Sequence, residues 1–92
     1  MNRYIRAFVL LETALGKEED VMDHLLKISG VKEAHIIAGE KDVLVVLELK
    51  SEILAQNTQI VSDFVRKNIA SLSHVNDTET IVPHRSKTKW SI

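Results

Sequence analysis

The stretch Val43-Leu44-Val45-Val46-Leu47-Glu48-Leu49 decides the fold of this 92-residue chain. Six of its seven residues are apolar, and it follows a Gly-Glu-Lys-Asp segment at residues 39–42. A strand with one face in water alternates apolar and polar residues, whereas this stretch predicts a strand that is covered on both faces. Because so short a chain has few elements to provide that cover, we expect another subunit to supply part of it.

Apolar periodicity predicts the elements around this stretch. A helical stripe begins with three carboxylates, which suit a helix N-terminus, and Gly30 is placed to end that helix. Pro83 cannot donate a hydrogen bond to a sheet and is expected to close the last strand. The expected elements are strands at 4–12, 31–38, 43–50 and 74–82, and helices at 17–29 and within 52–72.

Each predicted helix delivers the chain into a strand through a short link, Ser-Gly at residues 29–30 and Ser-His at residues 73–74. The apolar pattern of the first helix and strand recurs weakly 44 residues later. With right-handed crossovers, the order βαββαβ predicts an α+β, ferredoxin-like sandwich with a four-stranded antiparallel sheet and both helices on one face. The other sheet face would expose a large apolar patch, so we expect the chain to dimerise through it.

The composition excludes several kinds of site. With no cysteine, the chain has no disulfide, thiolate metal site or cysteine nucleophile, and it suits a reducing cytoplasm. No apolar run approaches a membrane span, and the N-terminus lacks the pattern of a signal peptide. The four histidines lack the paired spacing of metal ligands, and no glycine-rich phosphate loop is present. We therefore expect neither a cofactor nor a metal.

Charge divides the chain into two parts. Residues 84–92 contain three basic residues and no acidic one, which leaves the remainder with a net charge of −4. An acidic body disfavours a broad nucleic-acid-binding face. We therefore distinguish a folded domain at 1–83 from a basic tail at 84–92, whose Trp90 could dock onto a neighbouring subunit or stack weakly on nucleic acid.

Two segments resemble a known family. The run from Gly30 to Asp42 resembles the middle of the effector-binding domain of Lrp/AsnC transcription regulators, where a helix ends in Gly-Val, a strand follows, and a Gly-x-x-Asp turn opens the next strand. Residues 75–82 resemble the last strand of that domain, with its Thr-x-Thr-x-Val pattern. Together the resemblance covers roughly Ala7 to Pro83.

This resemblance implies an assembling sensor. The family domain forms dimers closed through their sheets, the dimers assemble into octamers or decamers, and a small effector, usually an amino acid, binds between dimers. In the family a helix-turn-helix precedes this domain, whereas this chain starts at the first strand of the domain, so we expect a stand-alone version. We expect it to join full-length Lrp/AsnC regulators without binding nucleic acid or a membrane itself. The ligand-binding residues implied are Gly39, Glu40 and Asp42 in the turn, and Thr80, Ile81 and Val82 in the last strand.

Other functions stay open. Gly39 and Asp42 equally fit a plain hairpin turn. Lys41 stands where family members often carry Tyr or Phe, which fits either an acidic ligand or a purely structural oligomerisation module with an empty site. No nucleophile–base pair is present, so we expect no catalytic residue, and a small dimeric α+β barrel enzyme would depend on His35 alone. Amino-acid-binding domains of the ACT type share the same element order.

Overall fold

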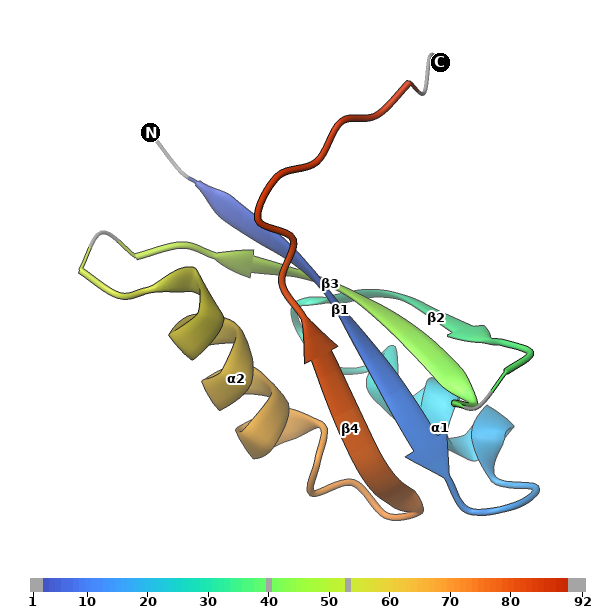
Figure 1. Cartoon of the computed structure of the whole chain (residues 1–92). Helices are drawn as coiled ribbons and strands as arrows, with labels where there is room; N and C mark the ends of the chain where they lie inside the picture. Colours follow the sequence, from blue (N-terminus) through green and yellow to red (C-terminus); the bar gives the residue numbers. More distant parts are fainter. Residues whose placement is uncertain (1–2, 40, 53, 90–92) are drawn as a thin grey trace.

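The computed structural model describes residues 3–39, 41–52 and 54–89. Four strands form one antiparallel sheet in the order β2-β3-β1-β4, and both helices cover the same face of it (Figure 1). This confirms the ferredoxin-like α+β fold. No helix among the described residues is long and apolar enough to cross a membrane. The elements are β1 (Tyr4–Thr13), α1 (Glu18–Leu25), β2 (Val31–Ile36), β3 (Val43–Lys50), α2 (Asn57–Asn68) and β4 (Val75–Ile81).

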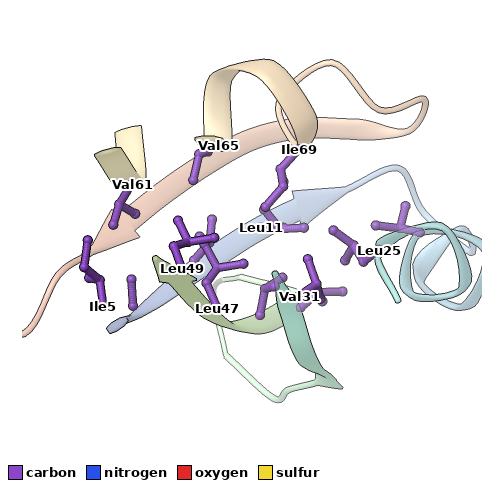
Figure 2. Packing of buried hydrophobic residues seen from close by; sticks show 14 residues of the cluster. Ile5, Leu11, Leu25, Val31, Leu47, Leu49, Val61, Val65 and Ile69 are labelled. Atoms are coloured by element: carbon purple, nitrogen blue, oxygen red, sulfur yellow. The ribbon is translucent and has the colours of Figure 1, made fainter. Parts of the chain in front are cut away.

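The hydrophobic core lies between the sheet and the two helices (Figure 2). The two central strands, β1 and β3, alternate, and every second residue of each points toward the helices and is buried. Aliphatic side chains fill this layer, in keeping with an aromatic content of only 4%. The core residues are Ile5, Ala7, Val9 and Leu11 from β1, Val43, Val45, Leu47 and Leu49 from β3, Val31 from β2, Val21 and Leu25 from α1, and Val61, Val65 and Ile69 from or next to α2.

The opposite face of the sheet, which we call the open face, is not covered by the described residues. Its centre is an apolar strip, in which Phe8 is paired with Val46 and Ile81, and Leu10 is paired with Leu44. Val46 is only 6% exposed, so the strip is already tightly packed at its centre. The apolar area is narrower than the sequence suggests, because charged and other polar side chains border it: Arg6, Glu12, Glu33, His35, Glu48, Lys50, Asp77 and Glu79.

The links that lead from each helix into the next strand have the same local structure. Gly30 and His74, 44 residues apart, each precede a strand and have positive φ angles of 100° and 71°. The weak sequence repeat is therefore also a structural repeat. In both links two N–H groups donate to the carbonyl group three residues earlier, those of Ile28 and Val31 in the first and those of Leu72 and Val75 in the second.

The helices are shorter than the sequence predicts. Helix α1 ends at Leu25, not at residue 29, so Gly30 does not end the helix but opens the path into β2. Helix α2 spans only Asn57–Asn68, and His74 lies in the link beyond it, not at the end of a helix or at the start of β4. The predicted helix ends were wrong because Ile28 and Leu72 lie in the turns after the helices but still pack against the core. They therefore extend the apolar periodicity beyond each helix.

The second strand is also shorter than predicted. β2 ends at Ile36, not at residue 38, and its pairing with β3 is interrupted between Val31 and Glu33. Such an irregularity adds an unpaired residue and increases the local twist. It turns Glu33 and His35 toward the open face while Val31 stays in the core.

Replacement of His74 by glycine is expected to stabilise the chain. An L-residue with positive φ costs roughly 1–2 kcal/mol, and the extra freedom of glycine in the unfolded state offsets about 0.4–1 kcal/mol of the gain. The His74 carbonyl accepts a hydrogen bond from the Ala14 N–H group at 2.8 Å, and this bond does not need the imidazole. We expect His74→Gly to raise the free energy of unfolding in urea by up to about 1 kcal/mol.

Ser73→Gly is the matched control, because Ser73 precedes His74 and does not have a positive φ. The glycine variant gains conformational freedom in the unfolded state but relieves no backbone strain in the folded state. Ser73→Gly should therefore lower the free energy of unfolding by up to about 1 kcal/mol. Equal losses in the two variants would contradict the assignment of strain to His74.

Candidate functional site

The turn between β2 and β3 is anchored to the end of β1. The Asp42 N–H group donates to the Leu11 carbonyl oxygen at 2.9 Å, and the Asp42 carbonyl accepts from the Ile37 N–H group at 2.9 Å. The Asp42 carboxylate Oδ2 accepts a hydrogen bond from the Thr13 N–H group at 2.9 Å. Asp42 is therefore held by a neighbouring strand, and its side chain satisfies the backbone of that strand. Glu40, a predicted site residue, lies outside the described residues.

The contact between Asp42 and Thr13 has a structural cause. The pairing of β1 with β3 ends at Leu11 and Val43, so the Thr13 N–H group, which points to the β3 side of β1, has no partner in that strand and needs another acceptor. Thr13 is 6% exposed, and its hydroxyl oxygen has no hydrogen-bond partner among the described residues. Sequence reasoning missed this bond because 29 residues separate its partners.

Lys41 joins the same turn to the start of β4. Its Nζ atom donates a hydrogen bond to Asp77 Oδ2 at 3.0 Å and lies 3.8 Å from Glu12 Oε2. The hydrogen bond with Asp77 raises the pKa of Lys41 and lowers the pKa of Asp77. Glu79 adds a further favourable charge interaction with Lys41. Lys41, which stands where family members often carry Tyr or Phe, thus has its ammonium group bound within the chain.

The Lys41–Asp77 pair predicts a dependence of stability on pH. Because the folded-state pKa of Asp77 lies below its ordinary value of 3.8, the stability it contributes is present above that pH and is lost as the pH falls through the folded-state value. We expect Asp77→Asn to be less stable than the wild type at neutral pH and the difference to shrink toward strongly acidic pH. Urea unfolding across this range measures it.

Asp23→Asn, on the exposed surface of α1, is the control for the loss of a carboxylate without this contact. A stability difference between wild type and Asp77→Asn that stayed constant down to strongly acidic pH would contradict the role of the ion pair.

The predicted residues of the last strand lie in different environments. Thr80 is paired with Val9 and shares its orientation toward the helices, where it is half-buried. Ile81 is paired with Phe8 and lies on the open face, 42% exposed. Val82 follows the strand and packs partly against the core. These three residues therefore cannot all line the same surface of one chain.

The two halves of the predicted site are also separated in space. Asp42 contacts β1 at Leu11, whereas Thr80 is paired with β1 at Val9 on the opposite side of that strand. Because β1 lies between β3 and β4, Asp42 and Thr80 lie on opposite sides of it, about 9.5 Å or two strand spacings apart, although Lys41 of the same turn reaches Asp77 of β4 across this gap. Within one chain, Asp42 and Thr80 do not line the same one of the described grooves.

Two grooves of the described residues lie at the other end of the sheet. One, of about 420 Å³, separates the start of β1 from the tail and is lined by Tyr4, Arg6, Phe8 and residues 86–88, among others. The second, of about 410 Å³, lies between residues 56–58 at the start of α2 and residues 82–84. Of the predicted site residues, Val82 lines the second of these grooves, and Trp90 lies outside the described residues.

The histidines form contacts of ordinary surface residues. His24 Nδ1 donates to the carbonyl oxygen of Asp20 at 2.7 Å on the surface of α1. His35 Nε2 lies 2.8 Å from Glu33 Oε1 on the open face, outside both grooves. Among residues 3–39, 41–52 and 54–89, no group of three His, Cys, Asp or Glu side chains is arranged to hold a metal ion.

Comparison with known proteins identifies the family of this domain. Residues 6–89 match the sequence profile of the family described as the Lrp/AsnC ligand binding domain. An uncharacterized HTH-type transcriptional regulator of Pyrococcus furiosus is 33% identical over 86 residues. That match includes 89% of this chain and 53% of the relative, so the chain spans about half the length of the regulator.

Solved structures share the fold of this chain. A hypothetical protein from Pyrococcus horikoshii has 30% identity and a TM-score of 0.68, with 89% of this chain and 92% of that chain covered. E. coli AsnC has 13% identity and a TM-score of 0.80, with 96% of this chain and 56% of that chain covered, and supports the fold alone. By the extent of the sequence match, this chain belongs to the Lrp/AsnC ligand binding domain family, as the resemblance of residues 30–42 and 75–82 predicts.

Proposed function

We propose that this domain is the sensing and oligomerisation part of a regulator, that its effector is an amino acid, and that the effector binds where copies of the chain meet. The proposal is supported by membership in a ligand-binding family with a transcriptional regulator as a relative. It is also supported by the separation of Asp42 from Thr80 in the single chain, because a site between copies can use both.

The observation that best supports the proposed assembly is the apolar strip on the open face. Phe8, Leu10 and Leu44 are only half-buried in one chain, and Ile81 is exposed. Contiguous apolar surface of this kind commonly marks a protein–protein interface. A second open face, packed at the usual spacing of about 10 Å between sheets, would remove the strip from water.

Asp42 is the residue we propose for recognition of the effector. Its carboxylate is half-buried, and a charge-assisted hydrogen bond to the ammonium group of an amino acid suits it. Gly39 has a φ of 141°, and a Cβ atom at this position would meet no atom within 4 Å, so there is space beside the turn. An effector held between copies favours the assembly that contains its complete pocket, and in this way it would alter complexes with full-length regulators.

Calorimetric titration with each of the twenty amino acids, combined with sedimentation, tests the proposal. Asp42→Asn keeps an oxygen acceptor for the Thr13 N–H group but removes the negative charge, so it should stay folded and lose effector binding. Asp42→Ala removes the acceptor as well and should also lower the free energy of unfolding by about 1.5–3 kcal/mol.

The two variants separate the recognition role of Asp42 from its structural role. Effector binding by Asp42→Asn with unchanged affinity would remove Asp42 from the proposed site. A chain that remains a monomer at all concentrations, with or without the amino acids, would overturn the proposed assembly.

One observation favours a second candidate function, a structural oligomerisation module with an empty site. Lys41 is engaged by Asp77 and Glu12, so its charge is already compensated beside the turn. In that case the chain would assemble, but no amino acid would change its thermal unfolding temperature or the size of its assembly. Binding of any of the twenty amino acids in the titration excludes this alternative.

A further inference from the structure

We propose that the groove of about 420 Å³ between the start of β1 and the tail binds a small phosphate ester, an organic molecule that carries a phosphate group. We call this groove the tail groove. Neither Asp42 nor Thr80 lines it, so this ligand is additional to the amino acid effector and does not depend on the function proposed above. Sites for small molecules commonly have volumes of about 300–1,000 Å³, and the tail groove lies within this range.

The polar lining of the tail groove consists of groups that can donate hydrogen bonds. Arg6 of β1 and Lys87 of the tail supply two positive charges, and an amide and two hydroxyl groups come from Asn57, Ser86 and Thr88. No acidic residue lines the groove, although the body of the chain before the tail has a net charge of −4. Such a lining suits a ligand that is anionic and rich in acceptor oxygens.

The two cations of the tail groove are not paired with carboxylates. Within the described part of the chain, neither Arg6 nor Lys87 takes part in an ion pair. Glu48 is paired in register with Arg6 across β1 and β3, but it does not line the groove. Arg6 lies instead over the ring of Phe8, with its Cζ atom 5.6 Å from the ring centroid. This cation–π contact restrains the guanidinium group and leaves its N–H groups available to an anion.

The pair of cations favours a phosphate group over a single carboxylate. A phosphate monoester carries a charge of about −1.5 to −2 at neutral pH and three acceptor oxygens, so it can bind a guanidinium and an ammonium group together. The apolar part of the lining comes from Ile5, Phe8 and Pro83. These side chains would cover the organic part of the ligand, which is why we propose an ester and not inorganic phosphate.

A small ester suits the tail groove better than a nucleic acid does. The lining comes from the start of β1, from Pro83 and residues 86–88, and from Asn57 at the start of α2, and the tail passes beside β1 (Figure 1). A nucleic acid strand longer than the groove would extend over the body of the domain, whose net charge of −4 repels phosphate groups.

Calorimetric titration of the full chain tests the proposal with three esters: glycerol 3-phosphate, glucose 6-phosphate and adenosine 5′-monophosphate. We expect at least one ester to bind roughly tenfold or more tightly than inorganic phosphate, and its parent alcohol not to bind. Binding should weaken as the salt concentration rises. No ester binding more tightly than inorganic phosphate would overturn the proposal. Tighter binding of a single-stranded oligonucleotide of about ten nucleotides than of every ester would overturn the assignment to a small molecule.

Charge removal tests the residues that we assign to the site. Arg6→Gln and Lys87→Gln should each weaken binding of the ester roughly tenfold or more, because each removes a charged donor. Lys50→Gln at the end of β3 and Lys89→Gln in the tail are the matched controls, since they remove the same charge nearby without lining the groove. Equal losses of affinity in all four variants would show general attraction by charge and would overturn the assigned site. Circular dichroism and sedimentation verify that each variant folds and assembles as the wild type does.

A cross-test separates this site from the amino acid site. Asp42→Asn should lose the amino acid and retain the ester, whereas Lys87→Gln should lose affinity for the ester and retain the amino acid. A chain that binds the ester but no amino acid would support the tail groove and remove the proposed effector. An Asp42→Asn chain that binds neither ligand, although it is folded, would overturn the separate ester site.

Discussion

Gly30→Ala is expected to lower the free energy of unfolding by about 2–5 kcal/mol, a large share of the stability of so small a domain. Two costs add at this position. Gly30 has a φ of 100°, which an L-residue adopts only with strain. A Cβ atom there would lie 2.8 Å from Leu49 Cδ2 in the core and 3.2 Å from the ring of Phe64, which packs against the core from α2.

Gly16→Ala is the matched control for this prediction. Gly16 also has a positive φ, 79°, but no atom lies within 4 Å of a Cβ placed there. It should show only the backbone cost of about 1–2 kcal/mol, so urea unfolding of the two variants isolates the packing cost at Gly30. Equal losses of stability would mean that Leu49 and Phe64 move aside without cost.

Leu10→Asp and Leu11→Asp should have opposite effects although the residues are adjacent. Leu10 belongs to the apolar strip of the open face, whereas Leu11 points toward the helices and is completely buried. We expect Leu10→Asp to remain folded and to weaken the dimer roughly 100-fold or more, because the interface would bury an unpaired charge. Leu11→Asp places that charge in the core and should cost more than about 4 kcal/mol, enough to unfold much of the protein.

Sedimentation and circular dichroism together measure both effects. A folded Leu10→Asp chain that still dimerises as the wild type does would show that the open face is not the interface. A folded Leu11→Asp chain would contradict the placement of the core. The pair thus tests the two faces of β1 with the same chemical change.

The two central strands, β1 and β3, were predictable from the sequence because apolar residues occupy both of their faces over most of their length. The range 43–50 is confirmed for β3 without a shift, and β1 differs from its prediction by one residue. Helix ends were less predictable, because Ile28 continues to contact the core after α1 has ended. Apolar periodicity reports contact with the core, and it does not distinguish the last turn of a helix from the turns that follow.

Less of the candidate site was predictable. The family resemblance draws attention to the turn and to Asp42, but the contacts of Asp42 with Thr13 and of Lys41 with Asp77 join residues 29 and 36 positions apart. Such contacts follow from the strand order and from the point where β1 and β3 stop pairing, which no local pattern encodes. The role of Thr80 in ligand binding stays a prediction, since it depends on how copies of the chain meet.

The order of strands leaves β2 and β4 at the two margins of the sheet, each with a row of backbone groups free to pair with another chain. β2 is short and interrupted, and it carries Lys32 and Glu33, while β4 carries Asp77 and Glu79. Short, irregular and charged margins discourage the endless strand-to-strand growth that leads to fibrils. In the assembly that we propose, these margins would keep the complexes closed and finite in size although each chain exposes an apolar surface.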